Sequence, residues 1–140
     1  MSIAAILAPV FVQVGLTFVL LFMMGRTRFA AVRAGEVKIR DIALGERAWP
    51  ARVTQVANTF HNQFETPVLF YALVALAIVT RQADLLFVVL SWLFVTARLV
   101  HAYVYTTTNN VLTRFRVFLA GTAVLMLMWA IFAVRILISG

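Results

Sequence analysis

Residues 3–24, IAAILAPVFVQVGLTFVLLFMM, form an apolar run without a single charged residue. As an α-helix this run would rise about 33 Å, enough to cross the hydrocarbon core of a bilayer. Arg26 and Arg28 follow the run and no basic residue precedes it, which argues against a cleaved signal peptide. Of the 140 residues, 64% are hydrophobic and only 12% are charged, so lipid is the expected solvent for most of the chain.

Three further apolar runs predict three more membrane-spanning helices, at about residues 50–80, 85–105 and 115–138. Pro50 suits a first helical turn, and we expect the second helix to continue unbroken to Thr80. Such a helix would rise about 45 Å, so its first turns should lie outside the hydrocarbon core. The sequence therefore predicts an all-α integral membrane bundle of four helices, with residues 1–140 as a single domain.

The basic residues indicate how the helices are oriented in the membrane. The chain has 12 Lys and Arg against 5 Asp and Glu, a net charge of +7. Only Arg81 and Arg135 lie on one side, whereas nine cations flank the first and third connections: Arg26, Arg28, Arg33, Lys38, Arg40, Arg47, Arg52, Arg114 and Arg116. The helix 1–2 and helix 3–4 connections are therefore predicted to be cytoplasmic, with both termini outside. No nucleic-acid partner is expected, because these cations follow the topology rule rather than forming a groove.

The chain contains no cysteine. This excludes disulfides, thiolate metal sites and a nucleophilic thiol of the protein's own. Any thiol chemistry would therefore need a thiol supplied by a small molecule. The sequence also lacks a glycine-rich phosphate loop and a serine with a plausible neighbouring base, so neither a P-loop nor a catalytic triad is expected.

Polar residues recur within two of the predicted helices, where lipid makes them costly. In the second helix they are Asn58, His61, Asn62 and Glu65, and in the third they are Arg98, His101 and Tyr105. In each helix the spacing places these side chains on one face. Glu65 and Arg98 fall at the same depth with opposite charge, and we expect them to form an ion pair. The two polar faces open toward Arg28, Arg114 and Arg116, which suits an anionic ligand.

These polar residues admit two other interpretations. The Glu65–Arg98 pair and the nearby amides could simply hold the helices together. A metal site built from His61, Glu65 and His101 would have two histidines and one carboxylate. Arg98 would repel a cation there and compete for Glu65, so no metal is expected.

The motifs in these helices resemble those of the MAPEG family, the membrane-associated proteins in eicosanoid and glutathione metabolism. Residues 62–65, Asn-Gln-Phe-Glu, match the family's Asn-x-x-Glu on helix 2. Residues 98–105 reproduce the Arg-x-x-His-x-x-x-Tyr pattern of its prostaglandin synthase branch. Arg114 stands where that branch has its thiol-activating arginine, and Arg28 matches a further arginine that contacts glutathione. The resemblance covers essentially the whole chain.

This resemblance implies a homotrimer whose ligand site lies between neighbouring subunits. It also implies a glutathione-dependent transferase or peroxidase that acts on lipophilic electrophiles, with glutathione as cosubstrate and a lipophilic small molecule or lipid entering from the bilayer. Arg114 is then the predicted catalytic residue. The predicted glutathione-binding residues are Arg28, Asn62, Glu65, Arg98, His101, Tyr105 and Arg116.

The sequence departs from the family pattern at three positions. Asn58 and His61 occupy places before Asn62 where the family often carries arginines, and Phe118 lies near the place of an expected tyrosine. These departures leave open a second interpretation, a non-catalytic membrane protein that serves as a lipid-binding module or as an accessory subunit of a larger assembly.

Overall fold

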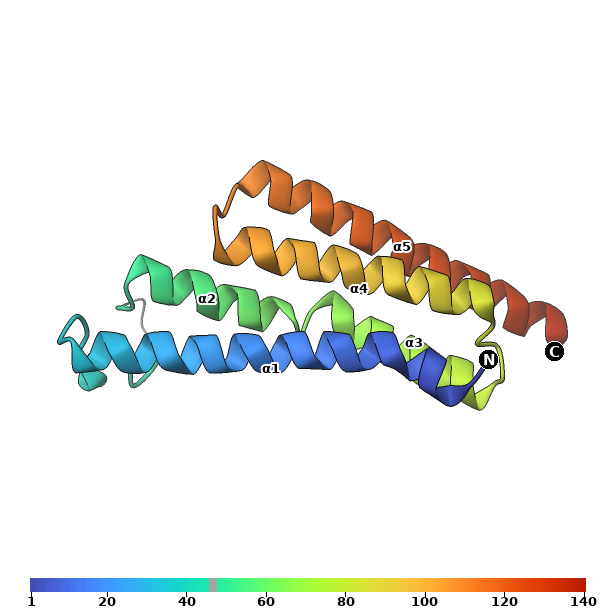
Figure 1. The fold of residues 1–140 in the computed structure, drawn as a ribbon, viewed down its shortest axis with the longest axis horizontal. Helices are drawn as coiled ribbons and strands as arrows, with labels where there is room; N and C mark the ends of the chain where they lie inside the picture. Colours follow the sequence, from blue (N-terminus) through green and yellow to red (C-terminus); the bar gives the residue numbers. More distant parts are fainter. Residues whose placement is uncertain (46–47) are drawn as a thin grey trace.

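The computed structural model describes residues 1–45 and 48–140 of the chain. Arg47, counted above among the basic residues, therefore lies outside the described residues. The elements, in order, are α1 (Ile3–Arg33), the short 3-10 helix η1 (Ile39–Asp41), α2 (Ala51–Asn62), α3 (Thr66–Val79), α4 (Leu85–Thr106) and α5 (Val111–Ser139). The described part contains no strand, and its long helices run side by side along one axis (Figure 1).

Four stretches of the described chain are long and apolar enough to cross a membrane: Ile3–Arg33, Ala51–Val79, Leu85–Thr106 and Val111–Ser139. The second of them comprises α2 and α3 together. The predicted fold class, an all-α membrane bundle with four spans, is confirmed.

The second span is not the unbroken helix that we predicted. α2 ends at Asn62 and α3 begins at Thr66, with a turn at residues 63–65. Pro67 lies in the first turn of α3. In a continuous helix Pro67 could not donate to the carbonyl of Gln63, and its ring would clash with that carbonyl. The break falls directly before this proline, and the prediction did not take Pro67 into account.

Capping side chains account for several helix ends. Ser2, Asp84 and Asn110 each accept a hydrogen bond from a backbone N–H in the first turn of α1, α4 and α5, respectively. Asn110 thus begins α5 four residues earlier than the predicted start at residue 115. α1 continues past residue 24 to Arg33, so Arg26 and Arg28 belong to this helix rather than to a loop.

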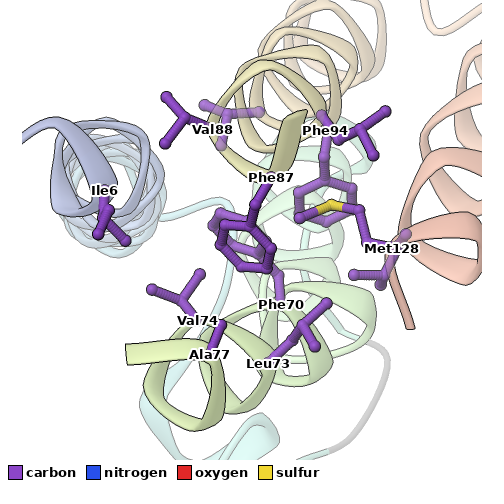
Figure 2. Close-up of a cluster of buried hydrophobic side chains, with 12 residues drawn as sticks. Ile6, Phe70, Leu73, Val74, Ala77, Phe87, Val88, Phe94 and Met128 are labelled. Atoms are coloured by element: carbon purple, nitrogen blue, oxygen red, sulfur yellow. The ribbon is translucent and has the colours of Figure 1, made fainter. Parts of the chain in front are cut away.

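The hydrophobic core joins all the spans near the ends that carry the termini. Phe70 and Leu73 of α3, Phe94 of α4 and Met128 of α5 are almost completely buried there, and Ile6 of α1 packs at its edge (Figure 2). α4 and α5 approach closely further along, since a Cβ added to Gly121 would lie 3.1 Å from the Cβ of Ala97.

The two ends of the bundle differ in what they carry. The N- and C-termini lie at one end, and the α1–α2 and α4–α5 connections lie toward the other (Figure 1). α1 and α2 extend beyond the α4–α5 turn at that end. The residues predicted to form the functional site are therefore found between the α2–α3 break and the connection-bearing end.

Candidate functional site

The site begins at a hydrogen-bonded contact between Arg98, which is buried, and Asn62, which is partly buried. Arg98 lies on α4 with only 2% of its surface exposed. Its Nη2 donates to the side-chain Oδ1 of Asn62 and, at 3.3 Å, to the backbone carbonyl of the same residue. Asn62 is the last residue of α2, and its carbonyl accepts from the backbone N–H of Glu65 at 3.3 Å as well as from Arg98. The end of α2 thus supplies the acceptors for a buried guanidinium.

The predicted ion pair between Glu65 and Arg98 is not formed. Asn62 stands between the two residues, because its Nδ2 donates to Glu65 Oε2 at 2.9 Å while its oxygens accept from Arg98. The turn at residues 63–65 leaves Glu65 exposed, outside direct contact with the buried guanidinium. The prediction assumed a continuous helix, and the break in that helix removes the geometry on which the pair depended.

Asn62 also lines a pocket of about 300 Å³, which we call the Arg114 pocket. Its lining residues are Asn62, Glu65, His101, Tyr105, Val111, Arg114, Phe115 and Phe118. The polar groups come from α2, the turn after it, α4 and α5, and the apolar wall comes from α5. His101 is buried and packs its ring against Tyr105 and Phe118, with centroid distances of 5.7 and 5.9 Å.

Arg114 is held in place from two sides. Its guanidinium carbon lies 4.1 Å from the centroid of the Tyr105 ring, within cation–π range. The guanidinium also donates to the side-chain Oδ1 of Asn109, a residue in the α4–α5 turn with a positive φ of 50°. Arg114 lies in the first turn of α5, where the backbone N–H groups and the helix dipole favour an anion.

A second pocket, of about 410 Å³, contains Arg28, and we call it the Arg28 pocket. Its other lining residues are Gly45, Trp49, Thr54, Ala57, Asn58 and His61. Arg28 lies against Trp49, with its guanidinium carbon 5.2 Å from the ring centroid. The two pockets have no lining residue in common: Asn62 and Glu65 line the Arg114 pocket, whereas Asn58 and His61 line the Arg28 pocket.

The predicted site residues are thus only partly brought together. Asn62, Glu65, His101, Tyr105 and Arg114 share the Arg114 pocket, and Arg98 contacts it through Asn62. Arg28 lies in the other pocket of the same chain, and Arg116 is exposed and lines neither pocket. No group of three histidine, cysteine or acidic side chains in the described residues could hold a metal ion. His61 faces the Arg28 pocket, away from His101.

Both pockets are bordered by buried polar atoms that lack a partner within the described chain. They are Nδ1 of His101, Nε of Arg28, and Nε and Nη1 of Arg98. Buried donors and acceptors of this kind are normally hydrogen-bonded, and leaving one without a partner costs about 1–3 kcal/mol. A polar ligand or ordered water would supply the missing partners.

Sequence reasoning missed two supporting residues. Asn109 holds Arg114, but a turn asparagine four residues from the site motif carries no distinguishing signal. Gln13 is fully buried on α1 and bonded to Gln63. A lone amide in the otherwise apolar run 3–24 was a usable signal, because a polar side chain in lipid needs a partner.

Four membrane-length spans in the described residues define an integral, multi-pass membrane protein, and a pocket that contains Arg114 lies beside the connection-bearing end of its bundle. A model of the MAPEG family matches residues 6–134, nearly the whole chain, and the protein belongs to that family. The family includes glutathione transferases and peroxidases together with other members, and it generally uses glutathione. No curated protein and no solved structure is significantly similar to this chain.

Proposed function

We propose that this protein is a glutathione-dependent membrane transferase or peroxidase that acts on lipophilic electrophiles. The observation that carries the proposal is the Arg114 pocket, which gathers a guanidinium, a phenol, an imidazole and an amide from α2, α4 and α5 and a carboxylate from the turn after α2. Because the chain has no cysteine, the nucleophilic sulfur would be that of bound glutathione.

Arg114 is the proposed thiolate-stabilising residue. Its guanidinium remains charged and has several donors, so it can hold an anionic sulfur beside the positive end of α5. Stabilising the thiolate lowers the pKa of the bound thiol, and the proton leaves to solvent. In a transfer reaction the sulfur electron pair forms a bond to the electrophilic carbon, and the leaving group departs with the electrons of the bond that breaks.

The other groups of the pocket suit the remainder of glutathione. Glu65 is exposed to the pocket and can accept from the ammonium group, while Asn62 fixes its orientation. Tyr105 and His101 offer hydrogen bonds to the peptide, and Nδ1 of His101 is without a partner in the described chain. Val111, Phe115 and Phe118 form an apolar wall for the cosubstrate.

We also propose a homotrimer in which the Arg28 pocket of one subunit faces the Arg114 pocket of the next. Arg28 and Arg114 line separate pockets of one chain, so a single subunit does not bring both cations to one ligand. Glutathione carries two carboxylates and a thiolate, which calls for more than one cation. The site would open toward the connection-bearing end, which we expect to be cytoplasmic because most of the basic residues flank the two connections there.

The test compares Arg114→Ala and Arg114→Lys with the parent protein. We expect alanine to abolish most of the ultraviolet absorbance of the thiolate of bound glutathione near neutral pH, and lysine to remove much of it. Glutathione should still bind through its carboxylates, as measured by calorimetry. Arg116→Ala is the matched control, because Arg116 is exposed two residues away and lines neither pocket.

Two results would contradict the proposal. If glutathione binds to the parent without any thiolate absorbance, Arg114 is a membrane-surface anchor and the catalytic role fails. If glutathione does not bind at all, the protein is a non-catalytic member of the family. Asn58 and His61 favour that second function, because they stand in the Arg28 pocket at positions where arginines would have strengthened anion binding.

A further inference from the structure

A buried hydrogen bond links α1 to the α2–α3 break. Gln13 of α1 is completely buried, and its Nε2 donates to Oε1 of Gln63 at 2.9 Å. Gln63 is 1% exposed, and its own Nε2 donates to the backbone carbonyl of Thr59 at 2.9 Å. Two glutamines and the last turn of α2 therefore form a short chain of hydrogen bonds within an apolar part of the bundle.

The place of Gln63 in the sequence connects this chain to the site. Gln63 directly follows Asn62 and precedes Glu65 by two residues, and all three belong to the end of α2 or to the turn after it. In the turn the backbone N–H groups of Gln63, Phe64 and Glu65 donate to the carbonyls three residues earlier, in place of the regular bonds of an α-helix. Pro67 has no N–H to continue the regular pattern. These bonds lie within the end of α2 and its turn, so the orientation of the turn relative to α1 and α4 depends on side-chain contacts with those helices.

Side chains from two neighbouring helices hold the turn. From α4, Arg98 donates to Asn62, and from α1, Gln13 donates to Gln63. Arg98 already borders the Arg114 pocket through Asn62, but Gln13 lines neither of the two pockets. Removing the hydrogen bond from Gln13 to Gln63 would let the turn rotate, although no residue that lines the Arg114 pocket is substituted.

We propose that Gln13 is a positioning residue, which orients the turn at residues 63–65 so that Asn62 and Glu65 face the Arg114 pocket. The inference rests on the proposed function insofar as those two residues bind glutathione. Gln13 acts through Gln63 and touches no ligand itself. Its effect should accordingly fall on ligand affinity, while the thiolate-stabilising Arg114, held by Asn109 and Tyr105, is left intact.

The experiment compares Gln13→Met with Leu20→Ala. Methionine has nearly the volume of glutamine but cannot donate to Gln63. Leu20 lies two turns further along the same helix and is 2% exposed, so its truncation destabilises the protein by leaving a cavity without removing a hydrogen bond. The variants are compared in detergent by melting temperature, hydrogen–deuterium exchange of residues 62–66, and calorimetry with glutathione.

We expect faster exchange of residues 62–66 in Gln13→Met, and glutathione binding about tenfold weaker, as for the loss of one well-placed hydrogen bond to a charged group. The thiolate absorbance at saturating glutathione should stay at the parent level. Leu20→Ala should lower the melting temperature while exchange of residues 62–66 and glutathione affinity remain unchanged. If Gln13→Met does not fold, Gln13→Asn shortens the same amide by one methylene and is expected to show the same pattern.

Parent-level exchange in Gln13→Met would overturn the inference, as would equal changes in Leu20→Ala, since either would make Gln13 a purely structural residue. Failure of the proposed function has a different signature. In that case the parent itself does not bind glutathione, and the exchange of residues 62–66 alone decides whether Gln13 positions the turn.

Discussion

Asn62 uses both ends of its side-chain amide, accepting from Arg98 with Oδ1 and donating to Glu65 with Nδ2. Arg98 is almost fully buried, and these contacts with Asn62 are its hydrogen bonds within the described chain. A buried charged group depends strongly on such partners. Stability should therefore be more sensitive to the neutral amide than to the carboxylate that the sequence suggested as partner.

Asn62→Leu is predicted to lower the stability of the protein more than Glu65→Gln. The leucine removes the side-chain acceptor of a buried guanidinium, which typically costs about 1.5–3 kcal/mol. Glu65→Gln keeps an oxygen that can accept from Asn62, and Glu65 is exposed. Melting temperatures in detergent measure the difference, with Asn58→Leu as the control because Asn58 is exposed one turn earlier on α2. If Glu65→Gln lowers the melting temperature more than Asn62→Leu does, Glu65 must interact directly with Arg98.

At the scale of elements, Asp84 connects the start of α4 to the end of α5. Its Oδ1 caps α4 by accepting from the N–H of Phe87, and its Oδ2 lies 2.7 Å from Nη2 of Arg135. The hydrogen bond from Arg135 lowers the pKa of the Asp84 carboxyl below its usual value, and the bond from the Phe87 N–H acts in the same direction. The helices joined by this pair therefore gain a pH-dependent contribution to stability.

Asp84→Asn is predicted to remove part of the acid sensitivity of folding. A carboxyl with a lowered folded-state pKa stabilises the protein above its unfolded-state pKa, and this contribution is lost as the pH falls through the folded-state value. The parent's melting temperature should therefore fall more steeply than the variant's between about pH 5 and about pH 3. Asparagine keeps the helix cap, so the slope isolates the charge. If the melting temperatures of the parent and the variant fall in parallel with pH, the contact with Arg135 contributes nothing to the pH dependence of stability.

At the scale of the whole molecule, the proposed trimer predicts complementation between two inactive subunits. Arg28→Ala and Arg114→Ala subunits, mixed equally, would combine an intact Arg28 with an intact Arg114 at about a quarter of the interfaces of a cyclic trimer. The thiolate absorbance of bound glutathione, at a concentration near the parent's dissociation constant, should rise correspondingly above that of either homotrimer. A signal equal to the mean of the two homotrimers would place both arginines in a site within one subunit.

The orientation of the whole molecule can be tested with single cysteines, because the chain has none of its own. Gly35 has a φ of +76°, so the exposed neighbouring residue Ala34 is the better position for a substitution. Ala34→Cys should resist an impermeant thiol reagent in intact cells and react after lysis, whereas Ser139→Cys should react in both conditions. The reverse pattern would place the connection-bearing end outside the cell.

The sequence by itself determined that most of the chain lies in lipid, that the fold is all-α, and that four segments span the membrane. Long runs without charge have few stable structures in lipid except helices, because every backbone polar group must be satisfied within the segment. The family resemblance assigned Arg114 to the site, the spacings placed Asn62 with Glu65 and His101 with Tyr105 on common helix faces, and the structure gathers these five in one pocket. Such inferences depend on local periodicity, which a single sequence records directly.

Only the tertiary structure decided which of these polar groups touch. Glu65 and Arg98 were predicted to pair because they fall at the same depth in the membrane. The break before Pro67 leaves Glu65 exposed, and Arg98 bonds to Asn62 at the end of α2 instead. The same packing placed Arg28 in a second pocket and joined Gln13 to Gln63. Contacts between residues far apart in the chain depend on helix rotation and on the exact place of a break, and a shift of one residue rotates a helical side chain by about 100°.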